Sequence, residues 1–219
     1  MGVEVYRRPT GTRPVQKATA EGIRVDAGYG GLVARASRGD VEAFRHLVQE
    51  HSSLIYRIAH SMLGAEHAQD ASQEVWIRVW RNIRSFRGES AFSTWLYRIT
   101  MNTCLSLRQR EARRGEREYA GDEMPYLPEP PGGEADPETQ ALSSERREEI
   151  HAALSHVRAE HRAALVLRHM EGLSYAEIAE VLEVPDGTAK GWVSRGRAAM
   201  LIALAEEDHG RRIKRGEAE

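Results

Sequence analysis

The chain has 219 residues, of which 41% are hydrophobic and 29% are charged, and its formal net charge is -2. This composition is typical of a globular protein with one or two small domains and excludes an intrinsically disordered chain. A protein without net positive charge can bind nucleic acid only through local basic patches. The one cysteine, Cys104, excludes a disulfide framework. No apolar run reaches the roughly 20 residues that span a bilayer, so we expect a cytoplasmic protein with no membrane insertion.

Residues 1–31 are polar and aperiodic, and we expect a flexible N-terminal extension there, with Gly28–Gly31 as a plain linker. Helical periodicity begins after Asp40, a good N-cap, and continues to Gly64, a good C-cap. The same periodicity predicts helices over about 65–84 and 91–114. Strand-like alternation is missing throughout, so the sequence predicts an all-α fold.

Residues 116–140 are rich in proline, glycine and acidic side chains, with one arginine, Arg117. Such a segment predicts a flexible acidic linker, and at ~3.3 Å per residue it reaches on the order of 80 Å when fully extended. A second helical unit follows over residues 141–207, and residues 208–219 form a basic C-terminal tail. The sequence therefore predicts two small helical domains, at 32–115 and 141–207.

The second unit carries the pattern of a helix-turn-helix. Ser174 and Glu177 form a capping box at the start of a short helix, Val184–Gly187 interrupt it, and a last helix begins near Thr188. Helical spacing turns Ala189 and Val193 toward the core. The outward residues are Thr188, Lys190, Ser194, Arg195 and Arg197, suited to reading base edges in the major groove. An ordinary helical hairpin with a solvated basic face is the alternative.

The stretch Ser85–Asn102 combines a short polar loop with an aromatic helix. Aromatic rings beside basic and amide groups suit unstacked, single-stranded bases. Spacing assigns Phe92, Trp95 and Ile99 to the core. The better candidates for a binding surface are Phe86, Arg87, Ser90, Arg98 and Asn102.

A polar stripe of Asp70, Gln73 and Glu74 lies on one face of the second predicted helix, and Arg78 follows Glu74 by one turn. Periodicity alone leaves open whether this stripe is a solvated face or a protein-docking surface. Catalytic and metal-binding patterns such as HExxH and GxSxG are missing from the sequence. We therefore expect neither an enzyme nor a protein with a metal or cofactor.

The residues resemble a known family. DASQEVWIRVWRNIRSFRGESAFSTWLYRITMN is similar to region two, and LRHMEGLSYAEIAEVLEVPDGTAKGWVSRGRAAM to region four, of the extracytoplasmic-function (ECF) sigma factors of bacterial RNA polymerase. The two motifs occur in the family's order with a linker between them. The resemblance implies a transcription initiation factor that binds core RNA polymerase, directs it to specific promoters and helps to melt the downstream element.

The resemblance also implies roles for individual residues. Asp70, Gln73, Glu74 and Arg78 match the surface that docks on the clamp helices of the largest polymerase subunit. Residues Phe86, Arg87, Glu89, Ser90, Arg98 and Asn102 match the site that captures non-template single strand of the downstream, minus-ten element. The helix beginning at Thr188 matches the reader of the upstream, minus-thirty-five duplex. Gly191, Gly196 and Trp192 depart from what such a recognition helix usually carries.

Further partners implied by the resemblance are the flap of the second-largest polymerase subunit and an anti-sigma protein that holds the factor inactive. A free-standing helix-turn-helix regulator is the alternative function. Such a regulator would bind duplex DNA without polymerase, whereas a sigma factor would bind it poorly alone.

Overall fold

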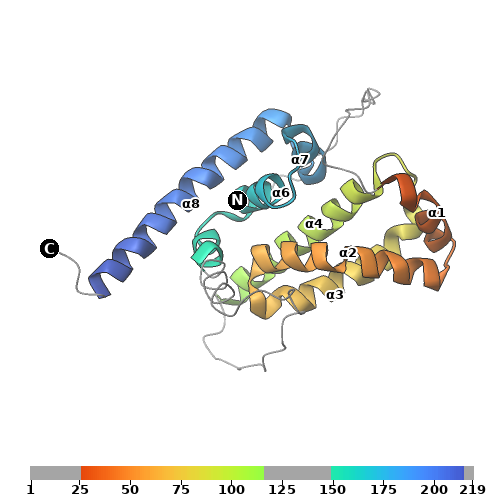
Figure 1. Cartoon of the computed structure of the whole chain (residues 1–219), viewed down its shortest axis with the longest axis horizontal. Helices are drawn as coiled ribbons and strands as arrows, with labels where there is room; N and C mark the ends of the chain where they lie inside the picture. The colour runs from red at the N-terminus through yellow and green to blue at the C-terminus, as the bar shows by residue number, and fades with distance from the viewer. Residues whose placement is uncertain (1–25, 116–148, 215–219) are drawn as a thin grey trace, which may run out of the picture.

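A computed structural model describes residues 26–115 and 149–214 of the chain. Every regular element within these ranges is helical, which confirms the all-α prediction (Figure 1). The predicted linker at 116–140 and the tail beyond Lys214 lie outside the described residues. In the described part of the chain, none of the helices is both long enough and apolar enough to cross a membrane.

The first domain is a bundle of helices that pack against one another through their apolar faces. Its elements are α1 (Asp26–Ser37), α2 (Val41–Leu63), α3 (Ala65–Asn82), the 3-10 turn η1 (Ile83–Ser85) and α4 (Phe92–Gly115). Asp40 caps α2 by accepting a hydrogen bond from the Ala43 amide, and Gly64 ends the helix with a positive φ of 93°. Both caps are where the sequence predicts them.

The predicted linker at Gly28–Gly31 is wrong, because these glycines belong to α1. Glycine lowers helix propensity by about 1 kcal/mol per residue, but tertiary packing outweighs this cost. Val33 and Ala36 of α1 are buried in the core that α2, α3 and α4 share. The described part of the first domain thus begins at Asp26, and the rest of the expected extension, residues 1–25, lies outside the described residues.

The second domain consists of a helical segment at 149–155 followed by α6 (Ala159–His169), α7 (Tyr175–Leu182) and α8 (Asp186–Lys214). The capping box is present in full: the Ser174 hydroxyl accepts from the Glu177 amide, and the Glu177 carboxylate accepts from the Ser174 amide. Glu183 adopts the left-handed conformation at the end of α7, with φ 55°. The tight turn from α7 to α8 is that of a helix-turn-helix.

The two domains pack against each other (Figure 1). One hydrophobic cluster contains Met62 and Met101 of the first domain together with Leu167 and Ile178 of the second. Buried Arg162 of α6 donates a hydrogen bond of 2.9 Å to the Met62 carbonyl, which lies in the last turn of α2. This bond satisfies a carbonyl that the helix end leaves without an intrahelical partner.

Candidate polymerase and promoter interfaces

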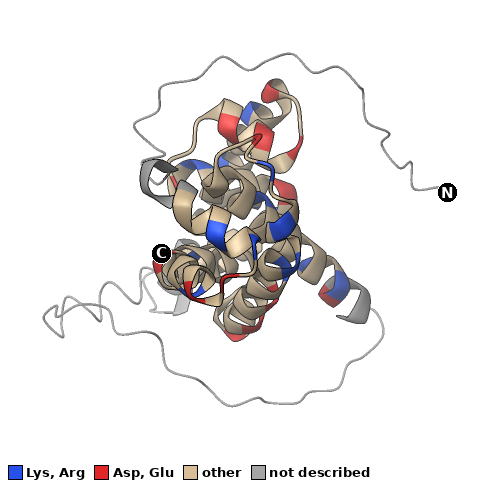
Figure 2. Ribbon diagram, turned by 90° about the vertical axis from the view of Figure 1, so that its right-hand side faces the viewer, with Lys and Arg blue, Asp and Glu red and all other residues tan. Residues whose placement is uncertain are grey.

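Acidic and basic residues are both spread over the helices of the molecule (Figure 2). The polar stripe predicted on α3 lies on the face opposite Ala68, Ala71 and Val75, which are buried. Asp70 and Gln73 are exposed, and Glu74 accepts a 2.7 Å hydrogen bond from Arg78 one turn later. The structure therefore places all four predicted docking residues on α3, with Arg78 holding the Glu74 carboxylate in place.

Sequence reasoning missed the apolar part of this face. Ile77 is 45% exposed and Trp80 is 38% exposed. Ile77 follows Gln73 by four residues and Glu74 by three, so it lies on the same stripe. Exposed Ile and Trp beside a carboxylate and an amide are a combination suited to a protein partner, because large apolar side chains supply binding energy that polar side chains alone do not. The helical spacing of position 77 relative to the stripe could have predicted from the sequence that Ile77 shares this face.

The predicted capture loop follows η1 and precedes α4. Arg87 and Glu89 are exposed, Ser90 is half-buried and Gly88 has a positive φ of 71°. Phe86 is half-buried, because its ring packs against Trp95 at 5.2 Å and Phe92 at 5.8 Å between centroids. Phe86 therefore offers only part of its ring to the surface that the sequence predicts. The loop rests on a fixed aromatic base of three rings, which favours one loop conformation.

The two polar residues predicted on α4 have different surroundings. Asn102 is exposed. Arg98 instead points to the second domain, where its guanidinium donates to the Glu180 carbonyl at 3.1 Å and lies 3.7 Å from the Glu183 carboxylate. The structure thus brings Arg98 together with the helix-turn-helix and leaves Asn102 open to solvent.

On α8 the predicted division into two faces holds. Ala189 and Val193 are buried, while Lys190, Ser194, Arg195 and Arg197 are exposed and Thr188 is half-buried. These five residues occupy the first turns of the second helix of the motif, the part that such motifs place in the major groove.

Both arginines of α8 contact histidines of α6. The Arg195 Nε donates to His161 Nε2 at 3.2 Å, and an Arg197 terminal nitrogen lies 3.4 Å from His169 Nε2. Burial, followed by the neighbouring arginine, lowers the pKa of each histidine. A neutral His161 accepts the bond and leaves the two terminal nitrogens of Arg195 free, the pair that binds guanine.

Trp192 and Gly196, which depart from the expected recognition helix, have packing roles. Trp192 is half-buried against the cluster shared by the domains. Gly196 is buried where α8 crosses α6. Gly196 has no side chain to contact a base and Trp192 is partly covered, so the reading surface of α8 is formed mainly by Lys190, Ser194, Arg195 and Arg197, with half-buried Thr188 beside them.

Comparison with protein families finds two matches along the chain. Residues 47–114 match the model of Sigma-70 region 2, and residues 147–200 match that of Sigma-70 region 4.

The chain belongs to the sigma-70 family.

Its curated relatives include ECF factors. It is 37% identical over 183 residues to the RNA polymerase sigma-H factor of Pseudomonas aeruginosa, covering 79% of this chain and 92% of the relative. It is 36% identical over 169 residues to the ECF RNA polymerase sigma-E factor of Haemophilus influenzae, covering 76% and 89%. The chain is therefore a transcription initiation factor that binds RNA polymerase and directs it to promoters.

Two solved structures have a similar fold. CnrH in complex with the cytosolic domain of CnrY matches with a TM-score of 0.55 and 24% identity, over 80% of this chain and 96% of that one. RpoE in complex with the anti-sigma factor NepR from Bartonella quintana matches with a TM-score of 0.57 and 22% identity, over 74% and 96%.

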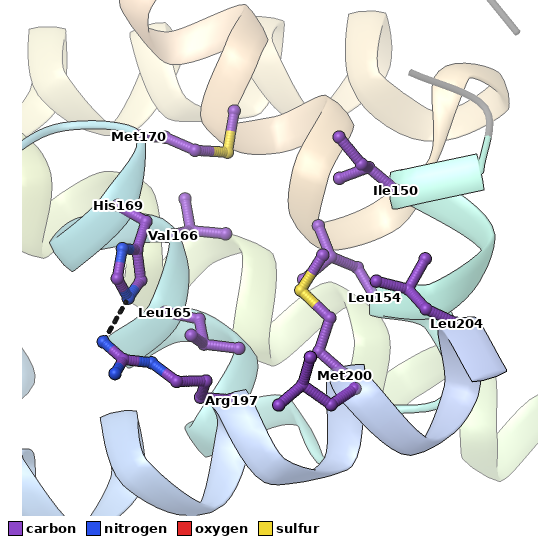
Figure 3. Close-up of a pocket in the computed structure, with 10 residues that line it drawn as sticks. Ile150, Leu154, Leu165, Val166, His169, Met170, Arg197, Met200 and Leu204 are labelled. Atoms are coloured by element: carbon purple, nitrogen blue, oxygen red, sulfur yellow. Dashed lines mark hydrogen bonds between the residues drawn. The ribbon is translucent and has the colours of Figure 1, made fainter. Parts of the chain in front are cut away.

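The sigma factor also has an apolar groove that the sequence did not indicate. It has a volume of about 360 Å³ and lies between the 149–155 segment, α6 and α8 (Figure 3). Its apolar lining comes from Ile150, Leu154, Leu165, Val166, Met170, Met200, Leu201 and Leu204, and His169 and Arg197 stand at one end. Leu201, in this lining, and its neighbour Ile202 are 62% and 61% exposed.

Proposed function

We propose that this sigma factor uses four surfaces: α3 and the groove beside α8 for docking on polymerase, the 86–102 region for the downstream promoter element, and α8 for the upstream element. The observation that carries the proposal is that one chain presents an exposed polar and apolar stripe on α3 together with a helix-turn-helix whose second helix exposes basic residues. A free-standing regulator needs the second feature but not the first.

On α3, Asp70, Gln73, Glu74 and Arg78 dock on the clamp helices of the largest subunit, and Ile77 adds apolar contact. Support comes from the exposure of Asp70, Gln73 and Ile77 along one helix face. The Arg78 bond to Glu74 reduces the side-chain freedom that docking has to remove.

At the downstream element, the 86–90 loop and Asn102 capture unpaired bases of the non-template strand. Extruding a base costs a few kcal/mol, and a preformed loop on an aromatic base offsets part of that cost. Phe86, Arg87, Glu89 and Ser90 form the loop, while Arg98 supplies a cation to the strand once it is released from the second domain. The exposed Asn102 amide has the donors and acceptor that a base edge requires.

At the upstream element, Thr188, Lys190, Ser194, Arg195 and Arg197 contact the duplex. The Nε bond from Arg195 to His161 supports this role, because it fixes the plane of the guanidinium and leaves its terminal nitrogens free. Lys190 and Arg197 also neutralise phosphates, which makes the affinity depend on salt.

The groove beside α8 accepts an apolar segment of the flap of the second-largest polymerase subunit. Its lining is almost wholly apolar and includes exposed Leu201, as expected for a groove that binds an apolar helix. We also propose that an anti-sigma protein holds the factor inactive in the cell interior; RpoE, which has a similar fold, is in complex with the anti-sigma factor NepR in its solved structure.

Run-off transcription from a genomic fragment library tests the proposed function. Purified chain is added to core polymerase, with core polymerase alone as the control. Discrete new transcription starts are the expected result, and their upstream sequences define both promoter elements. Duplex binding by the chain alone without new starts would contradict the proposal and favour a free-standing regulator.

A further inference from the structure

Two exposed arginines of α8 are paired with histidines of α6 through different parts of the guanidinium. Arg195 uses Nε, which donates to His161 Nε2 at 3.2 Å. Arg197 uses a terminal nitrogen, which lies 3.4 Å from His169 Nε2 (Figure 3). A bidentate pair with guanine requires two parallel N–H donors. Arg195 therefore keeps both terminal nitrogens for a base, whereas one terminal nitrogen of Arg197 is already engaged.

The space beside the terminal nitrogens of Arg195 is left open by a glycine. Gly191 precedes Arg195 by one turn of α8, and a Cβ atom there would lie 3.3 Å from both terminal nitrogens and 3.5 Å from the carbon that joins them. At that distance the guanidinium would have to move by a few tenths of an ångström. Glycine lowers helix propensity at this position, and the room it leaves for Arg195 gives that cost a function.

The acceptor in this arrangement is a neutral imidazole. Arginine Nε is always a donor, so His161 Nε2 accepts only when the single proton of the ring is on Nδ1. The charged groups around the imidazole are Arg195 of α8 and, at the start of α6, Arg158 and Glu160. The uncharged ring of Trp192 in α8 lies 6.4 Å from it. Burial and then the two arginines lower the pKa of His161, against the opposing effect of Glu160, so the imidazole is neutral at neutral pH.

We propose that His161 and Gly191 are positioning residues for Arg195, whose guanidinium they hold in place to bind a guanine of the upstream promoter element. The proposal rests on the proposed function of α8 in reading that element. In this arrangement neither positioning residue contacts the base. His161 fixes the Nε side of the guanidinium, and Gly191 leaves the terminal nitrogens uncovered.

Holding the guanidinium in place affects base discrimination more than overall attraction to DNA. A flexible arginine loses side-chain freedom when it binds a base, and a guanidinium that is fixed beforehand loses less. The base that benefits is guanine, which offers O6 and N7 as two acceptors in the major groove. A phosphate contact carries no sequence information. We therefore expect loss of the His161 acceptor to lower the preference for guanine at one position of the upstream element.

The test measures base preference with core polymerase and the full chain. Promoters found by run-off transcription are rebuilt with a randomised upstream element, transcribed with each variant and sequenced. His161→Leu removes the acceptor, whereas His161→Gln keeps an acceptor at about the reach of Nε2. His169→Leu is the matched control, because it removes the partner of Arg197 from the same helix. Arg195→Lys identifies the position that Arg195 reads, since lysine keeps the charge but not the fork of donors.

We expect the parent chain to prefer guanine roughly 10-fold at one position, and Arg195→Lys to abolish that preference. His161→Leu should reduce the preference at the same position at least ~3-fold, while His161→Gln and His169→Leu retain it. Gly191→Ala should also reduce it, although alanine favours the helix. Gly187→Ala should not, because a Cβ atom at position 187 would meet no other element of the described structure within 4 Å.

A pH series distinguishes positioning by a neutral imidazole from packing alone. Fluorescence anisotropy measures binding of the polymerase complex to two duplexes, one with the guanine and one with adenine in its place, from about pH 7 to about pH 5. The ratio of the two affinities cancels any loss of folded chain. Protonation removes the His161 acceptor, so the ratio should fall below pH 6.5, the ordinary imidazole pKa, in the parent chain. It should stay level in His161→Gln.

Three results would overturn the proposal: an unchanged guanine preference in His161→Leu, an equal loss in His169→Leu, or a parent ratio that does not change with pH. Circular dichroism shows whether each variant is folded, and if His161→Leu is not, the pH series of the parent chain and of His161→Gln decides. Failure of the proposed function looks different. No transcription starts with the parent chain would reject that function, whereas starts whose base preferences do not depend on Arg195 would reject its reading role.

Discussion

The backbone of Gly196 in α8 packs directly against Leu165 of α6. A Cβ atom at position 196 would lie 2.8 Å from the Leu165 side chain and 2.9 Å from the His161 carbonyl oxygen. The absence of a side chain allows the two helices to approach this closely. This contact sets how the recognition helix lies on the rest of the second domain.

We therefore expect Gly196→Ala to destabilise the chain by ~1–3 kcal/mol, the usual cost of overpacking, although alanine favours the helix. The His161 carbonyl is backbone and cannot move aside as a flexible side chain can. Urea unfolding followed by circular dichroism measures the change. A midpoint equal to or above that of the parent chain would show that α8 shifts without cost.

Gly191→Ala in the same helix is the matched control. There the three atoms nearest a Cβ atom would all belong to the Arg195 guanidinium, its terminal nitrogens at 3.3 Å, and a guanidinium moves easily. Alanine at this position should stabilise the helix by up to ~1 kcal/mol. Opposite signs for the two substitutions would distinguish a packing requirement from simple helix propensity.

We expect the folded chain to lose stability in mild acid, because the His151 imidazole lies at the domain interface. His151 faces His60 of α2 in an edge contact at 4.1 Å, and Arg162 of α6 lies nearby. Burial, then His60 and Arg162, lower the pKa of His151 to about 4 from an ordinary value of 6.5. Between these values the unfolded chain binds more protons than the folded chain, so stability is complete above pH 6.5 and falls below it.

The expected loss is on the order of 1 kcal/mol, less than the full shift implies, because the imidazole is only partly buried. His151→Gln should flatten the pH dependence of the urea midpoint between pH 7 and 5. His156→Gln removes an exposed histidine from the turn that follows and serves as the control. Equal pH profiles for the two variants would contradict the assignment to His151.

Docking on polymerase is tested on α3. Asp70→Ala combined with Glu74→Ala removes two acidic groups from the stripe and should weaken binding to core polymerase ~10-fold or more, about 1.4 kcal/mol. Glu66→Ala, an exposed acidic residue in the first turn of the same helix, should leave affinity unchanged. Competition for core polymerase against labelled parent chain measures the affinity of the unlabelled parent chain and of both variants. Parent affinity in the double variant would remove the docking role.

Much of this fold is encoded locally, and so could be predicted from the sequence. Asp40 and Gly64 bound α2, and Ser174 with Glu177 begins α7, because caps act within one turn of the residues that provide them. Amphipathic spacing likewise separated buried Ala189 and Val193 from the exposed residues of α8. The α1 helix was missed because burial of Val33 and Ala36 outweighs the low helix propensity of its glycines.

The candidate sites were predicted less completely, because their surroundings depend on contacts distant in sequence. Arg98 donates a hydrogen bond to the carbonyl of Glu180, 82 residues later, and no local sequence pattern predicts that bond. From the sequence alone, Gly196 only lowers the helix propensity of the recognition helix, whereas the structure shows that it allows close packing against α6. Periodicity tells which face a residue occupies, but not which other element covers that face.

We expect promoter opening to depend on Asn102. Asn102→Ala should reduce open-complex formation by about 5- to 10-fold, because it removes hydrogen bonds to an unpaired base worth ~1–1.5 kcal/mol. Core binding should not change, since Asn102 lies on α4 and the docking stripe lies on α3. Gln109→Ala is the control: it truncates an exposed amide seven residues later on the same helix. Permanganate reactivity of unpaired thymines on a promoter found by run-off transcription measures opening, and a parallel loss of core affinity in Asn102→Ala would count against a role in base capture.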